Sequence, residues 1–106
     1  MFRIVSDVHA GSTVALCPPK ISLDDGGEYH ASKAQLWLWE KWKDFWEQGE
    51  RMRRRMDAHC IDVFNGDMTE GDHHKSTQVL SGNPTAQAAV VNEVMKVPLA
   101  TKPDGI

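Results

Sequence analysis

Three side chains in this sequence have the types and spacing expected of metal ligands. Asp7 and His9 lie two residues apart after one apolar run, and Asp67 follows a second apolar run. Gly11 and Gly66 flank these ligand candidates, as expected where the backbone turns sharply and approaches a bound group. Carboxylate oxygens combined with an imidazole nitrogen suit Mn, Fe or Zn better than Mg or Ca. The sequence therefore predicts a divalent-metal site, and two such ions would clamp the oxygens of a phosphoryl transfer.

These ligand candidates can meet only if the two apolar runs are neighbouring parallel strands. Residues 2 to 6 and 60 to 64 are short and continuously apolar, which is typical of buried strands. Between them, Ser32 and Gln35 form a capping-box signature, and KAQLWLWEKWKDFWEQ predicts a helix that continues to residue 48. A strand, a crossover helix and a second strand make a βαβ unit with parallel strands. Ligands of open α/β sheets bind beyond the carboxyl ends of the strands, where the three side chains would converge.

The predicted helix carries a broad apolar stripe. Leu38, Trp42 and Phe45 recur at helical spacing, and Trp39 and Trp46 widen the stripe. Packing against a core is favoured over a stacking platform for a ligand. The width of the stripe indicates more apolar surface than this chain can cover, so we expect self-association through the tryptophan-rich helix.

The rest of the chain completes an α/β pattern. Residues 11 to 31 are rich in glycine and proline and predict a long loop. Asn83 as N-cap and Pro84 at the first helical position begin a second helix, which Pro98 is expected to end. The predicted order is βαβα, with no strand after the last helix, in a single partial domain that spans residues 1–106.

Two segments, SDVHAG and FNGDMTEG, resemble the first two sequence blocks of the calcineurin-like metallophosphoesterase family, in its phage-type members. The resemblance covers residues 2 to about 75. It implies that Asp7 and His9 bind the first metal and that Asp67 is shared by both metals. It also implies a four-layer αββα sandwich, of which this chain would be the N-terminal portion, and divalent-metal-dependent hydrolysis of phosphate esters or diesters. Mn²⁺ is the expected cofactor, with Fe, Zn or Mg as alternatives, and nucleotides or nucleic acid are candidate substrates.

The later blocks of the family are missing from the sequence. A Gly-Asn-His-Asp/Glu block would supply further ligands for the second metal, and SGNPT at residues 81 to 85 is a poor match because proline follows the asparagine. The later histidine blocks are also missing, so the second metal site is expected to be incomplete. We therefore expect an N-terminal fragment, and whether this chain is itself an enzyme stays open.

His73 and His74 are the remaining candidates near the predicted site. Adjacent histidines in a loop beside a metal can bind substrate phosphate, orient a ligand or carry a proton. A solvated loop without a role in the site is the alternative interpretation.

A basic run, RMRRRM, occupies residues 51 to 56. If the run is helical, Glu47 with Arg51 and Glu50 with Arg54 are favourable i,i+4 pairs, which describes a solvated helix face. A phosphate-attracting patch is the alternative. The patch belongs to a second hypothesis, in which the whole chain is a non-catalytic module that binds a metal or a partner. The partner would contact this basic run and the tryptophan-rich helix.

The composition favours a soluble globular protein, with 41% hydrophobic and 25% charged residues. Because no segment resembles a signal peptide or a membrane span, we expect a cytoplasmic protein without a membrane partner. A net charge of -3 and a pI of 5.9 argue against sequence-independent nucleic-acid binding by the whole surface. Cys17 and Cys60 match neither a disulfide framework nor a zinc pattern, so reduced thiols are predicted.

Overall fold

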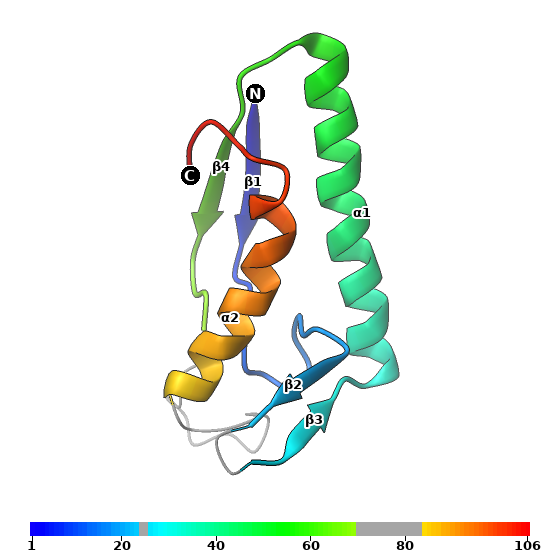
Figure 1. The fold of residues 1–106 in the computed structure, drawn as a ribbon, viewed down its shortest axis with the longest axis vertical. Coiled ribbons are helices and arrows are strands. Elements are labelled where there is room, and N and C mark those ends of the chain that lie inside the picture. The colour runs from blue at the N-terminus through cyan, green and yellow to red at the C-terminus, as the bar shows by residue number, and fades with distance from the viewer. Residues whose placement is uncertain (24–25, 70–83) are drawn as a thin grey trace.

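The protein has a small mixed α/β fold, seen in a computed structural model that describes residues 1–23, 26–69 and 84–106 (Figure 1). Within these ranges the chain forms two helices and two small two-stranded sheets. In chain order the elements are β1 (Phe2–Ser6), β2 (Lys20–Ser22), β3 (Glu28–His30), α1 (Lys33–Met56), β4 (Ile61–Asn65) and α2 (Pro84–Leu99). The α/β class is confirmed at this level.

The predicted pair of parallel strands is confirmed. β1 and β4 pair in parallel, in a register that sets Ser6 opposite Asn65. β4 lies one residue later than the predicted range 60 to 64. The long helix α1 runs back alongside the two strands and connects them (Figure 1). Both strands end at the same edge of the sheet, directly before Asp7 and Gly66.

The predicted loop at residues 11 to 31 contains a short antiparallel hairpin, so that prediction was wrong in part. β2 and β3 pair with Lys20 opposite His30 and Ile21 opposite Tyr29. Each strand has three residues, and Ile21 is the single residue of β2 that is buried. Strands this short cannot show the alternation of apolar and polar residues that identifies a strand in sequence.

α1 begins as predicted and ends later than predicted. The Ser32 hydroxyl accepts the Gln35 N–H, and the Gln35 side chain accepts the Ser32 N–H, so the capping box is confirmed. The helix continues past residue 48 to Met56. The predicted i,i+4 pairs stabilise this extension, because Arg51 contacts Glu47 at 2.9 Å and Arg54 contacts Glu50 at 3.1 Å.

The core lies between α1, α2 and one face of the β1–β4 sheet. Trp46 is fully buried and its ring lies 5.9 Å from the ring of Phe64 on β4. Trp42 is also buried, whereas Phe45 remains 43% exposed and Trp37 is largely solvent-accessible. The predicted packing role is therefore confirmed for Trp42 and Trp46, and half-buried Trp39 also packs against the core. The predicted stripe is shifted because Phe45 lies outside the core. The buried hydrophobic cluster comprises Val8, Ala10, Cys17, Ile21, Trp42, Trp46, Val90 and Val94.

α2 does not end before Pro98, as the sequence predicted, but includes it in its last turn. Proline has no N–H, so it cannot donate to the carbonyl oxygen four residues earlier, which belongs to Val94. The indole Nε1–H of Trp42 donates to that oxygen at 3.1 Å. The side chain from α1 thus satisfies the acceptor that Pro98 leaves open, and the helix tolerates the proline.

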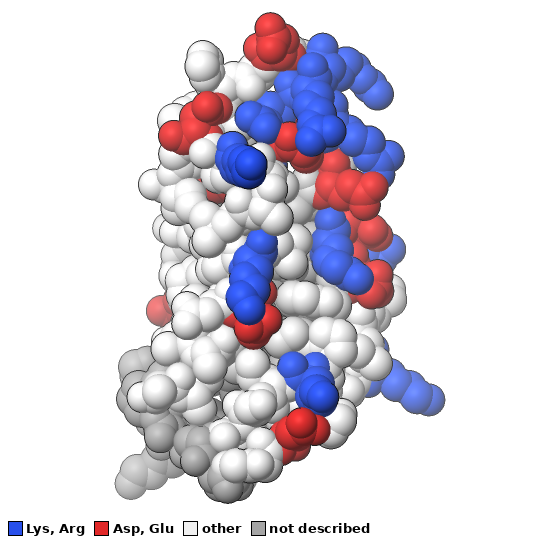
Figure 2. Space-filling model, viewed as in Figure 1, with Lys and Arg blue, Asp and Glu red and all other residues white. Residues whose placement is uncertain are grey.

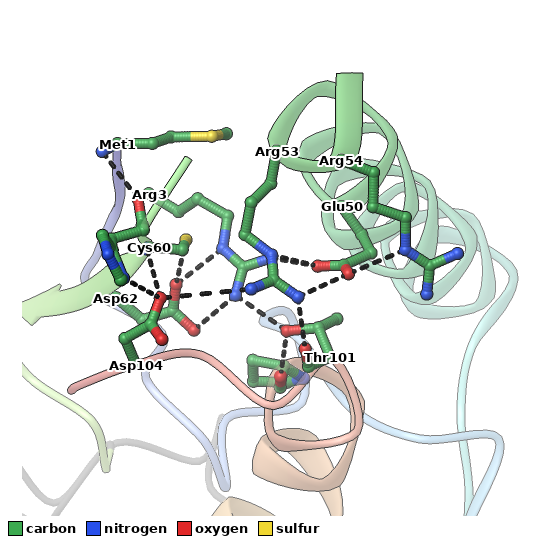
Figure 3. A network of polar contacts seen from close by, with 11 residues as sticks. Met1, Arg3, Glu50, Arg53, Arg54, Cys60, Asp62, Thr101 and Asp104 are labelled. Atoms are coloured by element: carbon green, nitrogen blue, oxygen red, sulfur yellow. Dashed lines mark hydrogen bonds and ion pairs between the residues drawn. The ribbon is translucent and has the colours of Figure 1, made fainter. Parts of the chain in front are cut away.

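A buried ion pair joins the amino-terminal parts of β1 and β4 (Figure 3). Arg3 donates to both carboxylate oxygens of Asp62, at 2.6 and 2.9 Å, and the two residues are 3% and 0% exposed. The guanidinium also donates to Thr101 Oγ1 at 2.7 Å, and it lies over the Trp46 ring and 3.6 Å from Glu50 of α1. One side chain therefore ties together both strands, α1 and the segment after α2.

The segment after α2 returns to the outer edge of β4. Asp104 N–H donates to the Cys60 carbonyl at 2.8 Å, and Asp62 N–H donates to the Gly105 carbonyl at 2.9 Å. Gly105 forms a parallel bridge with Ile61. The Cys60 N–H also donates to the Asp104 carboxylate at 2.7 Å, which lowers the pKa of Asp104. A third parallel segment thus begins beside β4, which the predicted βαβα order lacks.

Candidate metal centre

Backbone pairing continues past the ends of β1 and β4 and aligns the two ligand-bearing segments. Asp7 N–H donates to the Asn65 carbonyl at 2.9 Å, and His9 N–H donates to the Asp67 carbonyl at 3.0 Å. Ala10 N–H then donates to the carbonyl of Met68 at 2.9 Å. Since each of these bonds fixes one segment against the other, the ligand candidates are held by backbone geometry.

Asp7 and His9 both adopt left-handed backbone conformations, with φ of 53° and 49°. Non-glycine residues in this region are uncommon, and they cluster where a structure needs a side chain in a particular direction. Val8 between them is buried in the core, while Asp7 and His9 remain accessible. The turn therefore anchors its middle residue and presents the two polar residues to solvent.

Gly66 is required by the close approach of its backbone to Asp7. Its φ is +84°, and a Cβ added there would lie within 2.9 Å of Asp7 Cγ and collide with the carboxylate oxygen. Gly11 has φ of +102°, and a Cβ there would lie 2.9 Å from Gln87 Cγ on α2. The sharp turns predicted at both glycines are confirmed by their positive φ, and the close approaches seen here are to side chains of the chain itself.

The three predicted ligands meet at the carboxyl ends of the parallel strands. One ligand atom from each of Asp7, His9 and Asp67 lies within 4.8 Å of the others, and His9 Nε2 is 4.0 Å from Asp7 Oδ1. Two ligands bonded to one ion at about 2.2 Å can be at most about 4.4 Å apart. Small side-chain rotations would bring the three atoms into that range. The donor set and its spacing therefore fit one divalent cation.

Gln35 stabilises the loop behind this centre, a role that the sequence analysis did not foresee. It is fully buried, and its Nε2 donates to the carbonyls of Ser12 at 3.1 Å and Ala15 at 3.0 Å. Its Oε1 accepts the Tyr29 hydroxyl at 2.7 Å in addition to the Ser32 N–H. The capping-box signature predicts only the contacts between Gln35 and Ser32. The contacts of Gln35 with Ser12 and Ala15 join residues distant in sequence, so no local pattern indicates them.

The basic run is separate from the candidate metal centre. Lys and Arg side chains gather, mixed with acidic ones, at the C-terminal end of α1 (Figure 2). That end lies near the amino ends of β1 and β4, whereas the metal candidates follow the carboxyl ends (Figure 1). Glu50 accepts from both Arg53 and Arg54, and hydrogen bonding to Arg53 lowers the pKa of Glu50. Arg54 is exposed, as the interpretation as a solvated face predicts, whereas Arg53 and Glu50 are only partly exposed and lie toward the buried Arg3.

His73 and His74 lie outside the described residues, as does the predicted N-cap Asn83. Within the described ranges, Asp7, His9 and Asp67 form the only group of three or more His, Cys, Asp or Glu side chains that could hold a metal ion. Cys17 and Cys60 are free thiols, and both are buried.

Comparison with known proteins finds no matching family model, curated protein or solved structure. Neither described helix contains an apolar stretch long enough to cross a membrane.

Proposed function

We propose that this chain is the metal-binding portion of a metallophosphoesterase, an enzyme that hydrolyses phosphate esters or diesters with divalent metal ions. The observation that carries the proposal is the convergence of Asp7, His9 and Asp67 within 4.8 Å. The convergence occurs beyond the carboxyl ends of two parallel strands, the edge at which α/β proteins bind their ligands.

The chain's own residues would act by binding and orienting. Asp7 and His9 would hold one ion from the β1 side, and Asp67 would hold it from the β4 side. The carboxylates of Asp7 and Asp67 are exposed, so a phosphate group could reach an ion held there. A bound divalent cation supplies the positive charge that polarises a phosphoryl group. Mn²⁺ is the ion that we favour for this mixed oxygen and nitrogen donor set.

The number of ligands supports a second candidate function, a non-catalytic metal-binding module. In the part of the chain that the structure describes, three side chains converge, which is enough for one ion. The two-ion clamp of phosphoryl transfer needs further ligands. The metallophosphoesterase proposal includes a four-layer sandwich that supplies the remaining metal ligands. The proposal of a non-catalytic module does not need one.

Hydrolysis of bis(p-nitrophenyl) phosphate in the presence of Mn²⁺ tests the proposed reaction. With a single ion, we expect the 106-residue chain to show little turnover. Any turnover should be lost in Asp67→Asn and unchanged in Asp44→Asn, which makes the same change at an exposed position of α1. A chain extended with the missing ligand blocks should turn over much faster. Strong turnover that survives Asp67→Asn would contradict the proposed site, and an inactive extended chain that still binds Mn²⁺ would favour the module.

A further inference from the structure

Gln35, in the first turn of α1, is a buried residue that uses every hydrogen-bonding group of its side-chain amide. Its Nε2 donates to the backbone carbonyls of Ser12 at 3.1 Å and Ala15 at 3.0 Å. Its Oε1 accepts from the Tyr29 hydroxyl at 2.7 Å and from the Ser32 N–H at 3.1 Å. A glutamine amide offers two N–H donors and two oxygen lone pairs, so all four are used. Because carbonyl oxygens can only accept, both N–H groups are committed to the loop that contains the two carbonyls.

The loop that Gln35 holds is joined directly to His9. Ser12 N–H donates to the His9 carbonyl at 3.1 Å, and Ser12 is only 3% exposed. Gly11, inside this turn, has φ of +102°, a value that glycine adopts readily. Ser12 therefore links the Gln35 amide to the backbone of His9, because its carbonyl accepts from Gln35 and its N–H donates to His9.

His9 is held from two sides, and one of them is this loop. Its backbone is left-handed, with φ of 49°, a conformation that persists only where surrounding contacts hold it. Its N–H donates to the Asp67 carbonyl on the β4 side, and its carbonyl accepts from Ser12 on the loop side. Asp7 is held differently, because its N–H continues the strand pairing with β4. Loss of the Gln35 bonds to the loop should therefore move the imidazole and leave the Asp7 carboxylate in place.

We propose that Gln35 is a positioning residue of the candidate metal centre, which fixes the His9 imidazole through Ser12 and thereby sets the metal preference. The metal preference rests on the proposed metal site, whereas the placing of His9 does not. An imidazole nitrogen suits Zn, while carboxylates alone suit Mg. Without the Gln35 donors, His9 is released and the centre is reduced to the carboxylates of Asp7 and Asp67.

Two substitutions separate the loop contacts of Gln35 from its other contacts. Gln35→Glu keeps an oxygen for the Tyr29 hydroxyl and for the capping box, but a carboxylate cannot donate to the two loop carbonyls. Tyr29→Phe is the matched control, because it removes the contact with the hairpin and keeps both donors to the loop. Gln35→Met, which also lacks the donors but carries no charge, serves if a buried carboxylate unfolds the chain.

NMR of the metal-free protein tests the position of His9 without any metal. The imidazole signals of His9 are identified by their absence in His9→Ala. We expect them to shift or broaden in Gln35→Glu and Gln35→Met, and to match wild type in Tyr29→Phe. The signals of His59 should not move, since that side chain is 96% exposed and precedes β4 at the opposite end of the sheet. Unchanged His9 signals in the Gln35 variants would overturn the proposal, and so would an equal shift in Tyr29→Phe, which would indicate general loosening of the loop and hairpin.

Calorimetric titrations with Zn²⁺ and with Mg²⁺ test the metal preference. We expect the Zn²⁺ affinity of Gln35→Met to fall by about tenfold or more and its Mg²⁺ affinity to change little, because only the nitrogen ligand is released. Thr101→Val is the control, since it removes a hydrogen bond with Arg3 at the other end of the sheet, and it should leave both affinities unchanged.

An equal fall in both affinities, or no fall in either, would contradict the metal preference. A wild type that binds neither ion would overturn the proposed function and the metal preference with it. The NMR comparison in that case still decides whether Gln35 positions His9.

Discussion

The candidate metal centre depends on backbone conformations that few residues adopt. Asp7 and His9 are left-handed, and Gly66 passes so close to Asp7 that a side chain there would displace the Asp7 carboxylate. Strained residues of this kind persist only when surrounding contacts hold them, and here the backbone bonds to Asn65 and Asp67 do so. The backbone conformation at Asp7 is therefore set by its neighbours rather than by its own preference.

Gly66→Ala should weaken Mn²⁺ binding more than it weakens the fold. Left-handed φ makes alanine unfavourable by about 1–2 kcal/mol, and the new methyl group would also displace the Asp7 carboxylate. Gly26→Ala is the matched control, because Gly26 has φ of +83° and open space around it. We expect both variants to lose similar thermal stability, but only Gly66→Ala to lose Mn²⁺ affinity, by about tenfold or more. Equal Mn²⁺ affinities in the two variants would show that Asp7 is not a ligand.

Cys17 should be unreactive in the folded protein at neutral pH. Burial raises the pKa of its thiol from 9.0 to about 11, so the reactive thiolate is scarce. Burial also raises the pKa of Cys60. Because the folded state holds the Cys17 proton more tightly than the unfolded state, this thiol should lower stability as the pH rises from about 9 to about 11.

Reaction with dithionitrobenzoate at pH 8, with and without denaturant, measures this protection. We expect slow reaction in the native protein and rapid reaction of two thiols after unfolding. A thiol that reacts fully in the native state would mean that Cys17 or Cys60 is accessible.

At the scale of elements, α1 and α2 are joined by a contact that compensates for Pro98. The proline leaves the Val94 carbonyl without its helical donor, and the Trp42 indole donates to it at 3.1 Å. Val94 is fully buried, so this acceptor would otherwise be unsatisfied in the core.

Trp42→Phe should therefore reduce the free energy of unfolding by about 1–3 kcal/mol, the cost of a buried unsatisfied group. Trp37→Phe is the control, since Trp37 is 60% exposed, and its effect should stay within about 0.5 kcal/mol. Chemical denaturation of both variants supplies the comparison. Equal stabilities of Trp42→Phe and wild type would mean that the indole contributes nothing to the contact between the helices.

At the scale of the whole molecule, local patterns predicted the arrangement of the candidate site but not the contacts that hold it. The apolar runs and the capping box were sufficient to predict two parallel strands, the crossover helix and the shared edge of Asp7 and Asp67. The hairpin at Lys20–Ser22 and Glu28–His30 is too short to have a period. The pairing of Arg3 with Asp62 joins residues far apart in sequence, and no spacing rule connects them.

The whole molecule also has an apolar sheet face and a groove that its own described residues leave uncovered. The tryptophan-rich helix indicated such a surface in sequence, but the open edge of β1 became visible only in three dimensions. Sequence alone cannot show which side of a strand is left unpaired, because strand order follows from long-range packing. The self-association expected through the tryptophan-rich helix stays a prediction.

Calorimetric titration with Mn²⁺ tests most directly whether Asp7, His9 and Asp67 form a metal site. We expect one Mn²⁺ to bind per chain, with an affinity that falls by about tenfold or more in Asp67→Asn and stays unchanged in Asp44→Asn. His9→Ala should weaken binding in the same way, because it removes the single nitrogen ligand of the group. Equal Mn²⁺ affinities for wild type, Asp67→Asn and His9→Ala would contradict the metal site on which the proposed function rests.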